Sequence, residues 1–261
     1  MGFEGQTTTP NRANGNVGCT ISIFYGDGCF STYHHDLGKV VDHACLNNKT
    51  HIEQNRPLDL ASIHYLPCPT DPDLFRPVKV EKSYDLLFIG NNNSQSRFAL
   101  LYKIHQRFEH SVAGPDWEGT GLNSLTEAYG SDFFSRLVGQ ARILLGLMSD
   151  EWGKLEACFS NRAVNTLACG GFLIQRYTPG LEALFRNHEH LVWYSTEEEL
   201  FSLIGYCLDK PTERERIGNQ GRDLVISGFT YDRAVARILE DLGRISKKHR
   251  KITSFHLPPG R

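Results

Sequence analysis

Ser160, Asn161 and Arg162 stand where a polar triplet opens an apolar, small-residue segment at 163–169. Ser or Asn can cap the start of a helix, and Arg offers a planar fork of charged donors. A helix N-terminus also presents unbonded N–H groups and the positive end of the helix dipole, so this pattern is typical of a phosphate site. An ordinary helix capped for stability has the same pattern, and the triplet alone leaves both interpretations open.

The segments after this helix alternate between strand and helix. The Gly170-Gly171 pair stops the helix, and the apolar run Phe172-Leu173-Ile174 follows as a strand. A Pro179-Gly180 turn starts a second short helix, and Leu191-Val192-Trp193 gives a second strand. Helix, strand, helix, strand is the repeating unit of a parallel α/β sheet, which binds ligands at the carboxyl ends of its strands.

The same alternation begins upstream at Tyr84. The expected elements are a strand at 84–90, a helix at 97–109, a strand and turn at 110–117, a helix at 131–140 and a strand at 141–148. Helices beginning at 196, 211 and 231 follow the last strand. The pattern therefore predicts a Rossmann-like parallel sheet flanked by helices.

The N-terminal quarter is less regular. Residues 19–25 are β-branched and aromatic and predict a strand, and 33–47 has the apolar spacing of a helix. Gly26-Asp27-Gly28 lacks the third glycine and the helix of a dinucleotide loop, so we interpret it as a turn. The histidines at 34, 35 and 43, with Asp36, match no metal-ligand spacing.

Prolines at 67, 69, 72 and 77 exclude a regular helix or central strand between His64 and Ser83. We interpret 64–83 as an interdomain linker. Asp71-Pro72-Asp73 spells D-x-D, a metal-binding signature, but its place among prolines favours a turn.

The composition is that of an ordinary globular protein. The chain has 261 residues, 40% of them hydrophobic and 22% charged, with a net charge of -2, so nothing favours nucleic acid or an anionic membrane. No apolar run approaches the length of a membrane span, and no secretory signal is evident. The 7 cysteines are widely spaced without a C-x-x-C pair, which disfavours a disulfide framework or a zinc site. Buried free thiols at Cys158, Cys169 and Cys207 and a cytoplasmic setting are expected.

One series of motifs resembles the C-terminal, nucleotide-sugar-binding half of GT-B-fold glycosyltransferases: SNR…LACGGFLI…PGLEALF…EHLVWY…EEL. It is most similar to the CgeB-like spore-maturation group. The segment YLP…DPDLFRP also resembles the interdomain crossover of CgeB-like proteins. The likeness covers about 60–245 and is strongest at 160–231. It implies a remnant of the N-terminal domain at 1–63, the linker at 64–83, a donor domain at 84–246 and a basic tail at 247–261.

The resemblance also implies roles for single residues. In a metal-free GT-B site, arginine or lysine and helix ends neutralise the donor diphosphate. The implied diphosphate group is Gly90, Ser160, Asn161 and Arg162, and the implied ribose or sugar group is Asn165, Thr178, Pro179 and Gly180. Asn165 stands where many retaining enzymes carry a ribose-binding glutamate, and its amide can still bind a hydroxyl. Arg97 is a weaker diphosphate candidate.

The resemblance implies a metal-independent, retaining transfer of a hexosyl group from a nucleotide-diphospho-sugar substrate to an unidentified acceptor, without a cofactor. A full N-terminal GT-B domain needs more chain than the roughly 60 to 80 residues before the linker. We therefore expect a truncated N-terminal domain, which a second chain could complete, and assign no catalytic base or nucleophile. A non-catalytic nucleotide-binding or interaction module is the alternative. A GT-B-like epimerase would need a pair of acid/base carboxylates that the sequence does not show.

Overall fold

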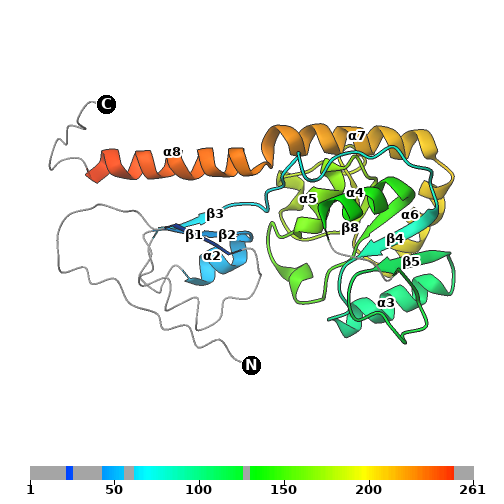
Figure 1. The fold of residues 1–261 in the computed structure, drawn as a ribbon. Coiled ribbons are helices and arrows are strands. Elements are labelled where there is room, and N and C mark those ends of the chain that lie inside the picture. The colour runs from blue at the N-terminus through cyan, green and yellow to red at the C-terminus, as the bar shows by residue number, and fades with distance from the viewer. Residues whose placement is uncertain (1–21, 26–42, 56–61, 126–129, 250–261) are drawn as a thin grey trace, which may run out of the picture.

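The computed structural model describes residues 22–25, 43–55, 62–125 and 130–249. Strands in this part of the chain form two parallel sheets, one of three strands and one of six (Figure 1). The small sheet has the order β1-β2-β3, with bounds β1 Ser22–Tyr25, β2 His43–Leu46 and β3 Ser62–Tyr65. Helix α2, Lys49–Asn55, follows β2 and packs beside β3.

The large sheet has the strand order β6-β5-β4-β7-β8-β9, and every neighbouring pair is parallel. Its strands are β4 Tyr84–Ile89, β5 His110–Ala113, β6 Asn123–Leu125, β7 Ala141–Gly146, β8 Leu173–Arg176 and β9 Val192–Tyr194. The chain builds outward from β4 in one direction and then from β7 in the other. The switch point between β4 and β7 is where open α/β sheets leave a crevice for ligands.

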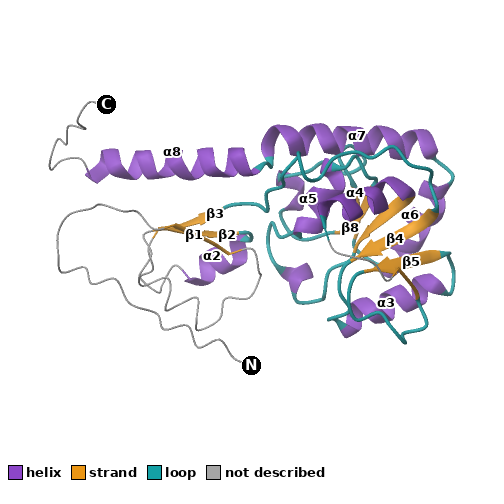
Figure 2. Cartoon of the chain, viewed as in Figure 1, coloured by secondary structure: helices purple, strands orange, loops and turns teal. Residues whose placement is uncertain are grey.

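Helices cover both faces of this sheet (Figure 2). One hydrophobic cluster joins the sheet to α4, α5 and α7, and a second joins it to α3 and α6. The bounds are α3 Gln95–His105, α4 Ser131–Gln140, α5 Asn161–Ala168, α6 Glu197–Leu208 and α7 Pro211–Gly228. Two short 3-10 helices, η2 Trp152–Lys154 and η3 Leu181–Ala183, lie in the loops after β7 and β8. The predicted fold class, a Rossmann-like parallel sheet flanked by helices, is confirmed.

The chain passes between the two sheets twice, at 66–83 and again between α7 and α8, and these two segments are hydrogen-bonded to each other. The backbone N–H of Thr70 donates to the carbonyl of Phe229 at 2.8 Å, and that of Tyr231 donates to Thr70 at 3.1 Å. Helix α8, Tyr231–His249, then extends over the small sheet, where Ala234 and Ile238 pack with its apolar residues (Figure 1). The domain boundaries drawn from the sequence stay a prediction, although β4 does begin at Tyr84.

The sequence patterns differ from the structure at several places in the described part of the chain, and α2 and β3 are among the elements they did not predict. Residues 43–46, expected at the end of a helix, form β2, because pairing with β1 and β3 on both sides buries this strand. Strand β6 was not expected either, since a segment of three residues, two of them polar, is too short to show apolar alternation. The predicted Gly26-Asp27-Gly28 turn and the histidines at 34 and 35 lie outside the described residues.

The Asp71-Pro72-Asp73 segment forms a turn, as predicted. The Asp71 carboxylate accepts from the backbone N–H of Asp73 at 2.9 Å and of Leu74 at 3.4 Å, which is a local turn contact. Cys158, Cys169 and Cys207 are buried free thiols, also as predicted. Within the described residues, no helix combines the length and apolarity needed to cross a membrane.

His110 makes the stability of the fold depend on pH. The side chain is 2% exposed and neither ring nitrogen has a hydrogen-bond partner in the described structure. Burial, with a smaller effect of His105, lowers the pKa of His110 from 6.5 to about 4. Between about pH 6.5 and 4, His110 is therefore protonated in the unfolded chain and neutral in the folded chain. The free energy of unfolding decreases as the pH falls through this range.

We expect acidification from pH 7.5 to 5 to cost the wild type about 2 kcal/mol more unfolding free energy than it costs His110→Phe. Urea unfolding of both proteins at the two pH values measures the difference. The other histidines are common to both proteins and cancel. Equal pH dependence in the two proteins would show that His110 is not held neutral.

Candidate functional site

A cavity of about 730 Å³ opens at the switch point, at the carboxyl ends of β4 and β7. Three segments line it: the loop after β4 with the first turn of α3, the loop after β7, and the first turn of α5. The lining residues are Asn91, 93–97, 147–152 and 160–162.

Two helices point their N-termini at this cavity. Ser94 caps α3 by accepting from the backbone N–H of Arg97. Ser160 stands at the N-cap of α5, but its side chain makes no capping bond, and Asn161 beside it is exposed. The hydroxyl of Ser160 and the backbone N–H groups of Asn161 and Arg162 are therefore available to a ligand, at the positive end of the helix dipole, while the N–H of Ala163 donates to the carbonyl of Ser160.

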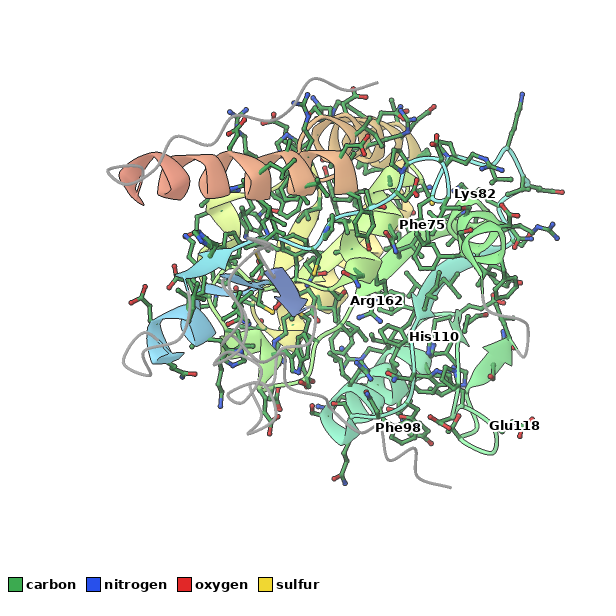
Figure 3. All side chains as sticks on the ribbon, turned by 60° about the vertical axis from the view of Figure 1, so that its left-hand side comes forward. Phe75, Lys82, Phe98, His110, Glu118 and Arg162 are labelled. Atoms are coloured by element: carbon green, nitrogen blue, oxygen red, sulfur yellow. The ribbon has the colours of Figure 1, made fainter. Side chains whose placement is uncertain are left out.

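Arg162 ties together the ends of the two strands at the switch point. Its Nη1 donates to the carbonyl of Ile89 at 2.6 Å, and its Nη2 donates to the carbonyl of Leu147 at 3.0 Å. Figure 3 shows Arg162 in the interior, surrounded by other side chains, whereas Glu118 points outward at the edge of the molecule. Its Nε is buried without a partner. Arg162 thus lines the cavity, but each of its two terminal nitrogens already donates one hydrogen bond to a backbone carbonyl.

Arg97 lines the cavity from the first turn of α3 and is 9% exposed. Its Nη2 donates to the carbonyl of Asn91 at 2.7 Å and also bonds the side chain of Asn93. Its Nε is buried without a partner, and its Nη1 makes no hydrogen bond within the described residues. Arg97 therefore keeps one whole terminal nitrogen, Nη1, for a ligand, whereas both terminal nitrogens of Arg162 already donate to backbone carbonyls.

The two guanidinium groups share one aromatic ring. Their central carbons lie 4.5 Å (Arg162) and 5.3 Å (Arg97) from the centroid of the Phe88 ring. Burial lowers the pKa of both arginines, and Arg97 lowers that of Arg162 further. In the described part of the chain neither forms an ion pair with a carboxylate. Burying two neighbouring positive charges costs free energy, and the cation–π contacts with Phe88 offset only part of that cost. A bound anion would offset more of it, so the site favours an anionic ligand.

The loop after β7 gives the cavity an acidic side. Asp150 and Glu151 both line it and are exposed. Asp150 accepts from Nη1 of Arg176 at 2.7 Å, which fixes the direction of its carboxylate. Trp152 is half-buried beside them. No group of three His, Cys, Asp or Glu side chains in the described residues is placed to hold a metal ion.

Gly90 supports the cavity without lining it. A Cβ at this position would overlap Nη1 of Arg162 and lie 3.0 Å from the ring of Phe88. The carbonyl of Gly90 accepts from the indole N–H of Trp117 at 2.6 Å. A side chain at Gly90 would therefore push Arg162 out of its place.

The predicted ribose and sugar residues lie elsewhere. Asn165 accepts from the hydroxyl of Thr70 at 2.7 Å, on the linker side of α5. Thr178 is fully buried and donates to the carbonyl of Cys158 at 2.8 Å, while the carbonyl of Pro179 accepts from the N–H of Ala157. Gly180 adopts φ 81 next to this segment. None of the four lines the cavity described above, and their predicted role stays a prediction.

Sequence reasoning missed the acidic segment 149–152, which carries no motif, and it favoured Arg162 over Arg97. The general rule for parallel sheets could have found this segment, because it follows a strand that the sequence predicted. What the sequence did not show was that β4 and β7 are neighbours.

A sequence profile described as glycosyl transferase-like matches residues 97–240, more than half of the chain. The chain belongs to the glycosyl transferase-like family. None of the curated proteins matches the sequence. The profile covers Arg97, the acidic loop and all of α5, so it includes every lining residue of the cavity except Asn91 and 93–96.

Solved structures of glycosyltransferases share the fold. Sucrose-phosphate synthase from Thermosynechococcus elongatus has a TM-score of 0.63 at 13% identity, over 82% of this chain and 61% of that one. A glycosyltransferase from Rickettsia africae has a TM-score of 0.62 at 14% identity, over 87% and 70%. The Anabaena protein HepE, solved with UDP and glucose, has a TM-score of 0.65 at 10% identity, over 86% and 72%. At these identities the likeness establishes the GT-B fold alone.

Replacing Arg162 by lysine tests its place between the two strands. A single ammonium cannot reproduce the planar fork that bonds both carbonyls, so one buried acceptor loses its partner. We expect Arg162→Lys to lose about 1–3 kcal/mol of unfolding free energy. Urea unfolding measures this, with Arg136→Lys on the exposed face of α4 as the control. Equal midpoints for both variants would contradict the assignment.

Proposed function

We propose that this chain supplies the donor-binding domain of a glycosyltransferase that uses a nucleotide-diphospho-sugar. The observation that carries the proposal is the pair of largely buried arginines, without carboxylate partners, at a switch-point cavity that two helices face with their N-termini. A diphosphate ester carries two negative charges, which matches two guanidinium groups. Charge-assisted bonds from Arg97 and helix-end amides offset the cost of burying the cations.

The same groups can assist the reaction itself. When the bond between the sugar and the diphosphate breaks, negative charge develops on the leaving phosphate. Arg97 and the N-terminus of α5 stabilise that charge from fixed positions, which lowers the barrier to departure. Because the protein's own cations supply the charge, we propose that transfer needs neither a metal nor a cofactor.

The acidic side of the cavity suits a neutral sugar. The carboxylates of Asp150 and Glu151 accept hydrogen bonds from hydroxyl groups, and Arg176 orients the first of them. A hexose at this end would leave the diphosphate at the cationic end. Hexosyl transfer, retention of anomeric configuration and membership of the CgeB-like group are parts of the proposal that rest on the sequence resemblance.

The glycosyltransferase family match and the GT-B structures support this reading. The HepE structure contains UDP and glucose, which makes UDP the first nucleotide to test. We propose that the small sheet lies on the acceptor side and that a second chain can complete it. The buried thiols at Cys158, Cys169 and Cys207 are consistent with the proposed cytoplasmic location.

Removing either arginine should weaken nucleoside diphosphate binding. We expect Arg97→Ala and Arg162→Ala each to raise the Kd for UDP or GDP at least tenfold, a loss of about 1.4 kcal/mol or more. Isothermal titration calorimetry measures it, after circular dichroism has confirmed folding at the working temperature. Arg136→Ala removes an exposed arginine outside the cavity lining and should bind as the wild type does. Unchanged affinity in Arg97→Ala would contradict the proposed diphosphate site.

Transfer can be separated from mere binding. With radiolabelled UDP-glucose or a GDP-sugar, we expect the chain to release nucleoside diphosphate by transfer or slow hydrolysis, at a rate that EDTA leaves unchanged. The arginines supply the charge that a metal would otherwise provide, which is the reason for the EDTA result. Donor binding without any turnover would instead favour the alternative function, a non-catalytic nucleotide-binding module. A rate abolished by EDTA would contradict the metal-independent mechanism.

A further inference from the structure

The loop between β7 and α5 contacts two parts of the protein. Its first part, 147–152, and its end at Ser160 line the cavity. Its middle is bonded instead to the small sheet and to α2. The carbonyl of Glu156 accepts from the backbone N–H of Lys49 at 2.9 Å, and that of Ala157 accepts from the hydroxyl of Tyr65 at 2.9 Å.

Further bonds strengthen this junction. The backbone N–H of Glu156 donates to the hydroxyl of Thr50 at 2.8 Å, and the thiol of Cys68 donates to the carbonyl of Phe159 at 3.4 Å. Every residue of 156–159 except Cys158 thus bonds a group that precedes the large sheet in the chain. The cavity loop is held from outside its own domain.

Ala157 is the unusual residue in this loop. It has φ 52, in the left-handed region that disfavours residues with a Cβ, and its side chain is fully buried. Two hydrogen bonds hold it there: its N–H donates to the carbonyl of Pro179 at 2.6 Å, and its carbonyl accepts from Tyr65. A strained residue persists only when its surroundings hold it in place, and such residues gather at functional sites.

Tyr65 is well suited to hold this strained residue. It ends β3, and its ring is half-buried under the ammonium group of Lys49, 5.7 Å from the ring centroid. Burial raises the pKa of Tyr65 above its ordinary value of 10.0, so the hydroxyl stays protonated and keeps donating at any physiological pH.

We propose that Tyr65 is a positioning residue for the donor site: its hydroxyl holds Ala157 in the left-handed conformation and so sets the path of the cavity loop into α5. This inference rests on the proposed donor-binding function. It also links the two sheets. Any acceptor or partner that displaces β3 changes donor affinity, and donor binding changes affinity for that ligand by the same factor.

Tyr65→Phe removes the hydroxyl and keeps the ring. We expect its Kd for UDP, measured by calorimetry, to rise three- to tenfold over that of the wild type. Tyr206→Phe is the matched control, because it removes an exposed hydroxyl that bonds Glu213 on the far helices α6 and α7. We expect its affinity to be unchanged.

Glycine at position 157 should rescue the loss. Glycine adopts positive φ freely, so the loop no longer needs the Tyr65 hydroxyl to stay in place. The double variant Tyr65→Phe, Ala157→Gly should bind UDP within about twofold of Ala157→Gly alone. Unchanged affinity in Tyr65→Phe, or a loss of the same size on the glycine background, would overturn the positioning role.

Hydrogen exchange separates this inference from the function on which it rests. In the unliganded protein, we expect backbone amides at 147–160 to exchange at least threefold faster in Tyr65→Phe than in the wild type, with amides of α6 unchanged. If the wild type bound no nucleotide while this difference appeared, the donor function would fall and the positioning role would stand. Equal exchange in the loop would overturn the positioning role whatever the protein binds.

Discussion

The bonds from one guanidinium group to the ends of two neighbouring strands hold the ligand face of this protein together. At a switch point the connections leave β4 and β7 in opposite directions, so no loop covers the gap between the strand ends. Arg162 crosses that gap and bonds the carbonyls of Ile89 and Leu147. Because the side chain projects from the first turn of α5, the same contact fixes where that helix begins relative to the sheet.

Room for this guanidinium comes from neighbours that have no side chain. Gly90 leaves space where a Cβ would overlap Arg162. A Cβ on Gly114, which has φ 127, would lie 2.5 Å from the carbonyl oxygen of Gly90. Phe88 contributes a ring face on one side of Arg162 and on one side of Arg97. The strand ends are thus close-packed around a buried positive charge. A bound anion can offset the free-energy cost of burying that charge, whereas apolar packing cannot.

The cavity depends on more than the domain that contains it. Its cationic side is built by the large sheet and its helices, and its loop is bonded in the middle to the small sheet through Tyr65 and Lys49. A loop that contacts both sides is a direct physical route by which one side can affect the other.

The sequence by itself determined the kind of fold and much of its order. Three local signals predicted most elements of the large sheet and its helices: hydrophobic periodicity, Gly and Pro at turns, and capping residues. The predicted bounds of α4 match the structure to the residue. These signals work because they depend on a few neighbouring positions. They failed at 43–46, where strand pairing with distant segments decided the outcome. They also identified Ser160, Asn161 and Arg162 as a cavity-facing helix start, since cap and charge lie in one short run.

Tertiary structure alone decided which residues meet. Asn165 lies one turn, about 6 Å, further along α5 than Asn161 and bonds Thr70 instead of facing the cavity. Arg97 and Arg162 are 65 positions apart, and they come to share the ring of Phe88 because β4 and β7 pair side by side. Strand order is set by packing across the whole sheet, so no local pattern could reveal that pair.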